Sequence, residues 1–179
     1  MPRPEPTGRE LFFRPSELIV SKTDTRGRIT YANSVFQHLA GYAEHELLGR
    51  PHSIIRHPDM PMCVFQLLWE RIAAGHEVFA YVVNLARNGD HYWVFAHVTP
   101  TYDADHQIVG YHSNRRVPAR DAVEQISGIY QLLRDEERRH KNKREGLAAS
   151  RAVLDSHLES QGMTYDAFVW DLTRRCAAA

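Results

Sequence analysis

The stretch that decides the fold reads Val82-Val83-Asn84-Leu85-Ala86-Arg87-Asn88-Gly89-Asp90-His91-Tyr92-Trp93-Val94. Two apolar runs flank Asn88-Gly89, a pair that tolerates the positive φ angles of a tight turn, so the stretch predicts a β-hairpin. The predicted strands carry an amide at Asn84 and aromatic rings at Tyr92 and Trp93. Aromatic faces beside hydrogen-bonding groups suit a flat ligand with polar edges, so the hairpin indicates a cofactor pocket.

The sequence on either side of the hairpin predicts further strands and a group of short helices. Asn33 is suited to cap a helix, Gly41 to end it, and Pro61 to open a longer helix. The predicted elements, in chain order, are strands at 17–21 and 28–32, a helix between Asn33 and Gly41, one or two helical turns at 44–48, a loop at 52–61, a helix from 61 to about 74, and strands at 78–86, 91–101 and 107–116. Strands grouped apart from helices predict an α+β fold with an antiparallel sheet.

The composition bounds the class of protein. The chain has 179 residues, of which 43% are hydrophobic, and its 22 basic and 22 acidic side chains cancel. A balanced charge is not typical of a nucleic-acid binder. The two cysteines, Cys63 and Cys176, lie far apart, as expected in a reducing compartment. The N-terminus does not resemble a signal peptide, and no run approaches the roughly 20 apolar residues that span a bilayer. We therefore expect a cytoplasmic protein without direct membrane insertion.

The chain divides into three parts by composition. Residues 1–15 are rich in proline and predict an irregular N-terminal segment, and residues 16–118 hold the predicted sheet and helices. Residues 119–179 predict a helical appendage, because apolar side chains recur there at spacings of three and four. Thr164 is suited to cap a last helix. The appendage is expected either to dimerise as a signalling helix or to cap the sheet.

Four segments carry a family resemblance. Residues 24–33 read DTRGRITYAN, residues 41–49 contain GY and ELLG, residues 51–61 read PHSIIRHPDMP, and residues 88–94 read NGDHYWV. In this order the segments resemble a PAS sensor domain, and the last two resemble the aerotaxis-receptor type, which binds FAD. The resemblance covers residues 23–120. It implies a five-stranded antiparallel sheet with short helices that enclose a cofactor pocket.

The resemblance also implies site residues. Six positions match residues tied to FAD binding or signalling in that family: Asn33, Arg56, His57, Asp59, Trp69 and Asn84. One position departs, since Val78 stands where the aerotaxis type has a tryptophan of its flavin pocket. Phe79, Tyr81 or Trp93 would then have to supply the aromatic contact. The candidate cofactor-binding residues are therefore Asn33, Arg56, His57, Asp59, Trp69, Phe79, Asn84 and Trp93.

For three of these residues the sequence leaves two interpretations open. Strand alternation places Asn84 among apolar neighbours, where an unpartnered amide would cost about 1–3 kcal/mol, so it bonds either a ligand or a neighbouring loop. Arg56 is suited to hold the FAD pyrophosphate, but it is equally suited to pair with Asp59. Trp69 lines the pocket or packs in the core.

Other chemistries find less support. The histidines do not form a set with metal-ligand spacing, and no nucleophile–base pattern is present, so we expect neither a metal site nor catalytic residues. Haem would need an axial histidine, and the helix predicted from 61 to 74 contains none, although His57 and His76 flank it. Cys63 does not lie in a motif that resembles the reactive cysteine of light sensors. We expect a protein that is not an enzyme.

Together these features predict a stand-alone cytoplasmic PAS sensor. The expected cofactor is noncovalent FAD, and the expected signal is redox or oxygen status. The partner is expected to be a separate chemoreceptor-like or other signalling protein, and the sensor is expected to be a homodimer that binds no nucleic acid. Two alternatives stay open: a haem-based gas sensor, and a cofactor-free protein-interaction module.

Overall fold

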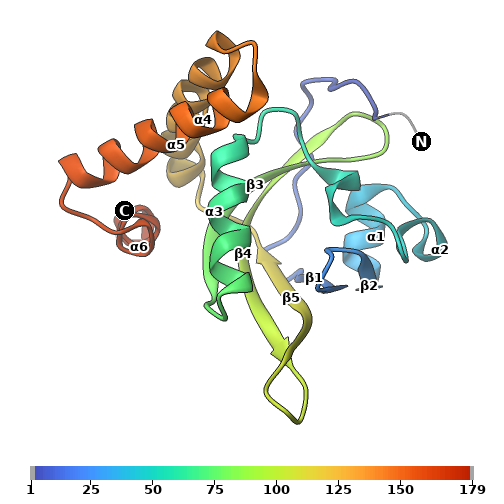
Figure 1. Cartoon of the computed structure of the whole chain (residues 1–179). Coiled ribbons are helices and arrows are strands. Elements are labelled where there is room, and N and C mark those ends of the chain that lie inside the picture. The colour runs from blue at the N-terminus through green and yellow to red at the C-terminus, as the bar shows by residue number, and fades with distance from the viewer. Residues whose placement is uncertain (1–2, 178–179) are drawn as a thin grey trace. The chain divides into compact units, whose positions relative to one another are not determined.

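The computed structural model describes residues 3–177, which divide into two units (Figure 1). Residues 3–57 and 71–117 form one unit, here called the sheet unit. Residues 58–70 and 118–177 form the other, here called the helical unit. The boundary passes through α3 (Met62–Ala73), whose residues up to Glu70 belong to the helical unit.

Five antiparallel strands form the sheet. They are β1 (Ile19–Asp24), β2 (Ile29–Ala32), β3 (Val78–Leu85), β4 (His91–Tyr102) and β5 (Ile108–Arg116), in the spatial order β2-β1-β5-β4-β3. Every pair of neighbours is antiparallel. The predicted α+β fold with a five-stranded antiparallel sheet is confirmed, and the predicted strands agree with the observed ones to within a few residues.

The register of the strands defines a buried inner face. Ala80 of β3 pairs with Ala96 of β4, which pairs with Arg115 of β5, which pairs with Ile19 of β1. Directly paired residues share a face, so these four side chains lie on the same side of the sheet. Buried side chains dominate this face: Ile19, Ser21, Val78, Ala80, Val82, Asn84, Tyr92, Val94, Ala96 and Arg115.

Short helices pack on the inner face. In α1 (Ser34–Ala40), the Asn33 side chain accepts the N–H of Phe36 at 3.0 Å, and Gly41 ends the helix at φ 72°. Phe36 is fully buried, and its ring lies 4.6 Å from Cζ of Arg115 on the inner face. The predicted cap and stop of this helix are confirmed. The helix α2 (Glu44–Leu47) follows it.

One segment differs from the prediction. Residues 52–61 predict a loop, but the first four form the 3₁₀ helix η1 (His52–Ile55). The carbonyl of Pro51 accepts the N–H of Ile54 at 2.9 Å, and the proline ring fixes its own φ at a value that suits such a turn. Pro51 therefore starts a helical turn where the sequence predicts a loop. This turn places the His52 ring 5.8 Å from the Phe36 ring.

The N-terminal segment docks on the hairpin. The N–H of Thr7 donates to Gly89 O (2.8 Å), the N–H of His91 donates to Arg9 O (2.9 Å), and the N–H of Leu11 donates to His91 O (2.7 Å). Residues 7–11, here called the strap, thus run beside the start of β4. The strap is fixed by the Asp90 carboxylate, which accepts from Thr7 Oγ1 at 2.6 Å and from Arg9 Nε at 2.9 Å. These bonds from Arg9 and Thr7 lower the pKa of Asp90 to about 2.

We predict that Gly89→Ala releases the strap. A Cβ at Gly89 would lie 2.1 Å from Glu5 O, and the backbone has φ 88°. Left-handed strain alone costs about 1–2 kcal/mol, so the protection of strap amides from hydrogen exchange should fall by about tenfold or more. Gly49→Ala is the control, because Gly49 has φ 73° with no atom within 4 Å of the added Cβ. Equal strap protection in the two variants would contradict this prediction.

The helical unit contains α4 (Arg120–Arg139), α5 (Lys143–Ser160) and α6 (Tyr165–Ala177) together with most of α3 (Figure 1). The helix α4 contacts both α5 and α6. The predicted cap of the last helix is confirmed, since Thr164 Oγ1 accepts the N–H of Ala167 at 3.2 Å. Buried apolar side chains of the three helices form the core: Ala122, Val123, Ile126, Tyr130, Leu133, Leu154, Leu158, Phe168, Val169 and Leu172.

The break between α4 and α5 lies at residues 140–142, and Gly146 lies inside α5. Asn142 starts α5, because its side chain accepts the N–H of Arg144 at 2.9 Å. A Cβ at Gly146 would lie 2.7 Å from Glu137 O of α4. Gly146 therefore permits close approach of two helices instead of ending one.

Within the helical unit, α3 is bonded to α4 and α5. Glu137 of α4 accepts the N–H of Met62 at 2.7 Å, so a carboxylate caps the N-terminus of α3. The same oxygen accepts the Ser150 hydroxyl at 3.0 Å. Arg151 of α5 pairs with Glu70 of α3 at 2.9 Å. Both neighbouring helices therefore hold α3 through charged groups.

Candidate ligand site on the inner face of the sheet

A polar cluster lies on the inner face. Ser21 of β1, Asn84 of β3, Tyr92 of β4 and Arg115 of β5 are each at most 4% exposed. His52 of η1 and Phe36 of α1 join them, as shown below. These six residues, here called the inner-face cluster, all belong to the sheet unit. Polar side chains buried in an apolar setting need partners, so their hydrogen bonds decide what the cluster does.

Several donors of the cluster have no partner. Among the described residues, Asn84 Nδ2, Tyr92 Oη, and Nε and Nη1 of Arg115 are buried and make no hydrogen bond. Asn84 and Tyr92 are direct neighbours in the β3–β4 register, so their side chains share one patch of the sheet. Each such group costs about 1–3 kcal/mol when left unsatisfied. Four donors on one face therefore favour a bound molecule rich in hydrogen-bond acceptors.

The charge of the cluster is positive. Burial lowers the pKa of Arg115 to about 10, which leaves the guanidinium protonated at neutral pH. Burial, together with the charge of Arg115, lowers the pKa of His52 to about 3, so its ring is neutral there. Burial also raises the pKa of Tyr92 and keeps its phenol protonated. The cluster thus presents one cation and neutral donors.

A hydrogen-bond chain holds the cation. Nη2 of Arg115 donates to Ser21 Oγ. The Ser21 hydroxyl then has its proton free for His52 Nε2, which lies 3.1 Å away. This assignment makes Nε2 the acceptor of the imidazole and places the ring proton on Nδ1. The Phe36 ring covers one side of the guanidinium at 4.6 Å. Arg115 is therefore fixed by groups that do not neutralise it.

Two other predicted site residues lie next to Asn84. The backbone of Arg56 forms an isolated antiparallel bridge with the backbone of Asn84. His57 is 6% exposed, and its ring lies 5.6 Å from the ring of His91. The structure thus brings Asn84, Arg56 and His57 together at the hairpin end of β3.

Asn33 lies apart from these residues and is fully engaged in the fold. Its Oδ1 accepts the N–H groups of Val20 and Phe36, each at 3.0 Å. Its Nδ2 donates to Leu18 O at 2.7 Å. The side chain therefore joins β1 to the start of α1, and the structure gives it a structural role.

Phe79 and Trp93 lie on the opposite face of the sheet from Asn84. Side chains alternate along β3, so Phe79 points away from the face that Val78 and Asn84 share. Phe79 stacks on His97 at a ring distance of 4.1 Å, and Trp93 pairs with Val83 on the same outer side. The structure does not bring either ring to the inner-face cluster. The aromatic contact missing at Val78 is therefore not supplied by these residues.

Asp59 and Trp69 belong to the helical unit. The Asp59 carboxylate lies 2.8 Å from Nη1 of Arg134 in α4, which also donates to the Asp59 carbonyl at 2.9 Å. Trp69 is 39% exposed on α3. The structure gives Asp59 an ion pair within its own unit, and it gives Trp69 a half-exposed position there.

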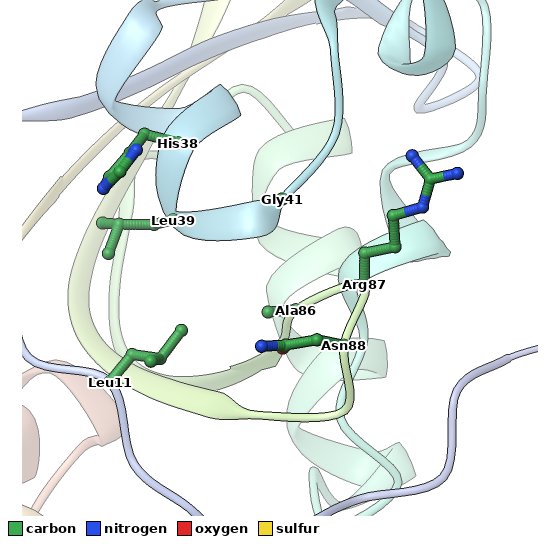
Figure 2. A pocket seen from close by; sticks show the side chains of 7 residues that line it. All are labelled: Leu11, His38, Leu39, Gly41, Ala86, Arg87 and Asn88. Atoms are coloured by element: carbon green, nitrogen blue, oxygen red, sulfur yellow. The ribbon is translucent and has the colours of Figure 1, made fainter.

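A separate surface pocket of about 400 Å³ lies in the sheet unit (Figure 2). It lies between the strap, the end of α1 and the hairpin turn. Arg87 lines it, and the guanidinium of Arg87 is already paired, because its Nη1 lies 2.8 Å from the Glu46 carboxylate. Figure 2 shows the Arg87 side chain extending away from Leu11 and Leu39. The lining residues are Leu11, His38, Leu39, Gly41, Ala86, Arg87 and Asn88. The pocket shares no residue with the inner-face cluster.

The side chains described for residues 3–175 include no group of three His, Cys, Asp or Glu that could hold a metal ion. Cys63 is buried, and burial raises the pKa of its thiol to about 11, which makes it a poor nucleophile. None of the helices that the structure describes is long and apolar enough to cross a membrane.

Comparison with known proteins assigns the class. Residues 29–115 match the PAS fold, and this part of the chain is a PAS domain. The chain is 36% identical over 115 residues to the aerotaxis receptor of Escherichia coli K12, which covers 64% of this chain and 22% of that protein. It is 28% identical over 109 residues to the nitrogen fixation regulatory protein of Klebsiella pneumoniae, and this match covers 59% of this chain and 22% of that protein. The chain thus spans about a fifth of the length of these relatives.

A solved structure supports the same fold. The dark structure of the blue-light photoreceptor Aureochrome1 LOV superimposes with a TM-score of 0.56 at 20% identity, over 64% of this chain and 85% of that one. The predicted PAS fold is therefore confirmed.

Proposed function

We propose that this chain is a flavin-binding PAS sensor that holds FAD noncovalently at the inner-face cluster. The observation that carries the proposal is the set of buried donors without partners on Asn84, Tyr92 and Arg115. The similarity to an aerotaxis receptor supports FAD as the ligand and redox or oxygen status as the signal.

The inner face fits a flat ligand with polar edges. Ala80 and Ala96 pair across β3 and β4, so two small side chains lie side by side on this face. Asn84 and Tyr92 offer donors farther along the same strands, and an isoalloxazine edge carries matching carbonyl and ring-nitrogen acceptors. A guanidinium suits a pyrophosphate, so Arg56, whose backbone adjoins Asn84, is the residue proposed to bind that group. The residues present therefore suit a flavin.

The chain itself offers a route from the site to an output. When bound, a flavin supplies a change of charge and protonation on reduction. Asn84 and Arg115 would bind the two redox states with different affinity, and only such a difference shifts a conformational equilibrium. Arg56 is joined to Asn84 by a backbone bridge, and three residues later Asp59 forms an ion pair with Arg134 of α4. The segment 56–59 therefore links the cluster covalently to the helical unit.

We further propose a homodimer that reports to a separate chemoreceptor-like protein. The similarity to the aerotaxis receptor supports this kind of partner. Analytical ultracentrifugation of the purified chain tests the dimer, and a monomer at micromolar concentration would overturn that part of the proposal.

Absorption spectroscopy of the purified protein tests the cofactor, and Asn84→Ala tests the site. We expect flavin bands, and we expect the variant to retain FAD about tenfold less well, because a lost hydrogen bond to a buried ligand costs about 1.5 kcal/mol. Asn114→Ala is the matched control, since Asn114 lies on the outer face of β5. Wild-type protein that neither contains nor takes up FAD would overturn the proposal. A Soret band in its spectrum would identify haem as the cofactor in place of FAD.

A further inference from the structure

We propose that Arg115 sets the reduction potential of the flavin by placing a fixed positive charge on the inner face of the sheet. This inference rests on the proposed function. It concerns a residue that the sequence motifs do not single out, and it assigns the regulation of the site to one side chain.

Arg115 is buried without a counter-ion among the described residues. The residue is 2% exposed, and within the part of the chain that the structure describes its side chain has one hydrogen-bond partner, the neutral Ser21 hydroxyl. Nε and Nη1 remain without an acceptor. A buried cation is costly unless it is paired, so a ligand that carries or acquires negative charge would complete this site.

The residues around the guanidinium of Arg115 hold it in place and leave its charge intact. The Phe36 ring lies 4.6 Å from Cζ, and Ser21 is in turn bonded to His52 at 3.1 Å. None of Phe36, Ser21 and His52 carries a negative charge. The arginine is therefore preorganised, and little rearrangement is needed when charge develops nearby.

The consequence is a preference for the reduced ligand. Addition of two electrons and one proton gives the isoalloxazine one net negative charge, the electrons coming from a low-potential donor such as dithionite in the test below. Attraction between opposite charges is strong in a buried site, and charge near the ring is a recognised control of flavin potential. Arg115 should thus raise the potential and set the threshold at which the sensor responds.

Redox titration of the full-length chain with dithionite and indicator dyes tests the proposal. We expect Arg115→Gln to shift the ratio of reduced to oxidised flavin at least tenfold toward oxidised, which is about 30 mV for a two-electron couple. Arg115→Lys, which keeps the charge, should stay within about threefold of wild type. Arg116→Gln is the matched control, because Arg116 is the next residue, exposed, and on the outer face.

The outcomes separate this inference from the proposed function. Wild-type protein that binds no FAD overturns both. Wild-type and Arg115→Gln proteins that bind FAD with the same potential overturn only the role of Arg115. If Arg115→Gln loses FAD or does not fold, the lysine variant decides, since restored binding with a near-normal potential supports the charge. Failure of Arg115→Lys to restore binding would then contradict it.

Discussion

Replacement of Gly146 with alanine is expected to destabilise the helical unit by about 1–3 kcal/mol, as overpacking typically does. Helix propensity alone predicts the opposite, because alanine is favoured over glycine inside a helix by about 1 kcal/mol. The contact between an added Cβ at Gly146 and Glu137 decides whether the substitution stabilises or destabilises the protein. The added Cβ would lie 2.7 Å from the backbone oxygen of Glu137, and a backbone atom of a packed helix has little freedom to move. Denaturant unfolding followed by helical circular dichroism measures the change.

Gly128→Ala is the matched control. Gly128 lies inside α4, and a Cβ there meets no atom within 4 Å. The same substitution should therefore stabilise the protein by up to about 1 kcal/mol. The two variants are expected to move the unfolding midpoint in opposite directions. Equal stabilisation by both would show that α4 and α5 do not cross closely at Gly146.

The second large effect is a loss of stability in mild acid that depends on His52. Its pKa is about 3 in the folded chain and 6.5 ordinarily, because burial and the charge of Arg115 disfavour the imidazolium. Below pH 6.5 His52 binds a proton in the unfolded chain but stays neutral in the folded chain until the pH approaches 3. The contribution of His52 is therefore complete above pH 6.5 and is lost as the pH falls toward 3. The slope is about 1.4 kcal/mol per pH unit.

Urea unfolding at pH 7.5, 6.5 and 5.0 measures this dependence. Between pH 6.5 and 5.0 the wild type should lose about 2 kcal/mol more than His52→Asn, which has no proton to take up. The variant removes the Phe36 stack and so lowers stability at every pH, but only the difference in slope reports the titration. Parallel pH profiles for the two proteins would contradict the prediction.

Local patterns in the sequence predicted the sheet and the position of Asn84 well. The Asn88-Gly89 turn and the alternation along β3 depend on neighbouring residues, so both can be read without the fold. The same alternation places Phe79 on the other face of the sheet from Asn84. Phe79 therefore cannot supply the aromatic contact that is missing at Val78. Phe79 was one of the residues expected to replace the family's tryptophan, and strand geometry does not permit that contact.

The rest of the site depends on pairings between distant residues. Arg115 and Arg116 are adjacent and chemically identical, and only the register of β5 against β1 and β4 shows which one is buried. Ser21 and His52 join the cluster through contacts that span much of the sheet unit. Gly146 follows the same rule, because its contact with Glu137 depends on how two helices cross.

The strap has a practical consequence for anyone who shortens this chain. The PAS match begins at residue 29, which invites removal of the first residues. Yet β4 begins at His91 and its pairing with β5 begins only at Phe95, so residues 7–11 occupy an edge that would otherwise be bare. An uncovered strand edge is a template for pairing with another copy. A protein that starts after Leu11 should therefore self-associate through this edge, and a dimer seen in such a fragment would not test the homodimer proposed above.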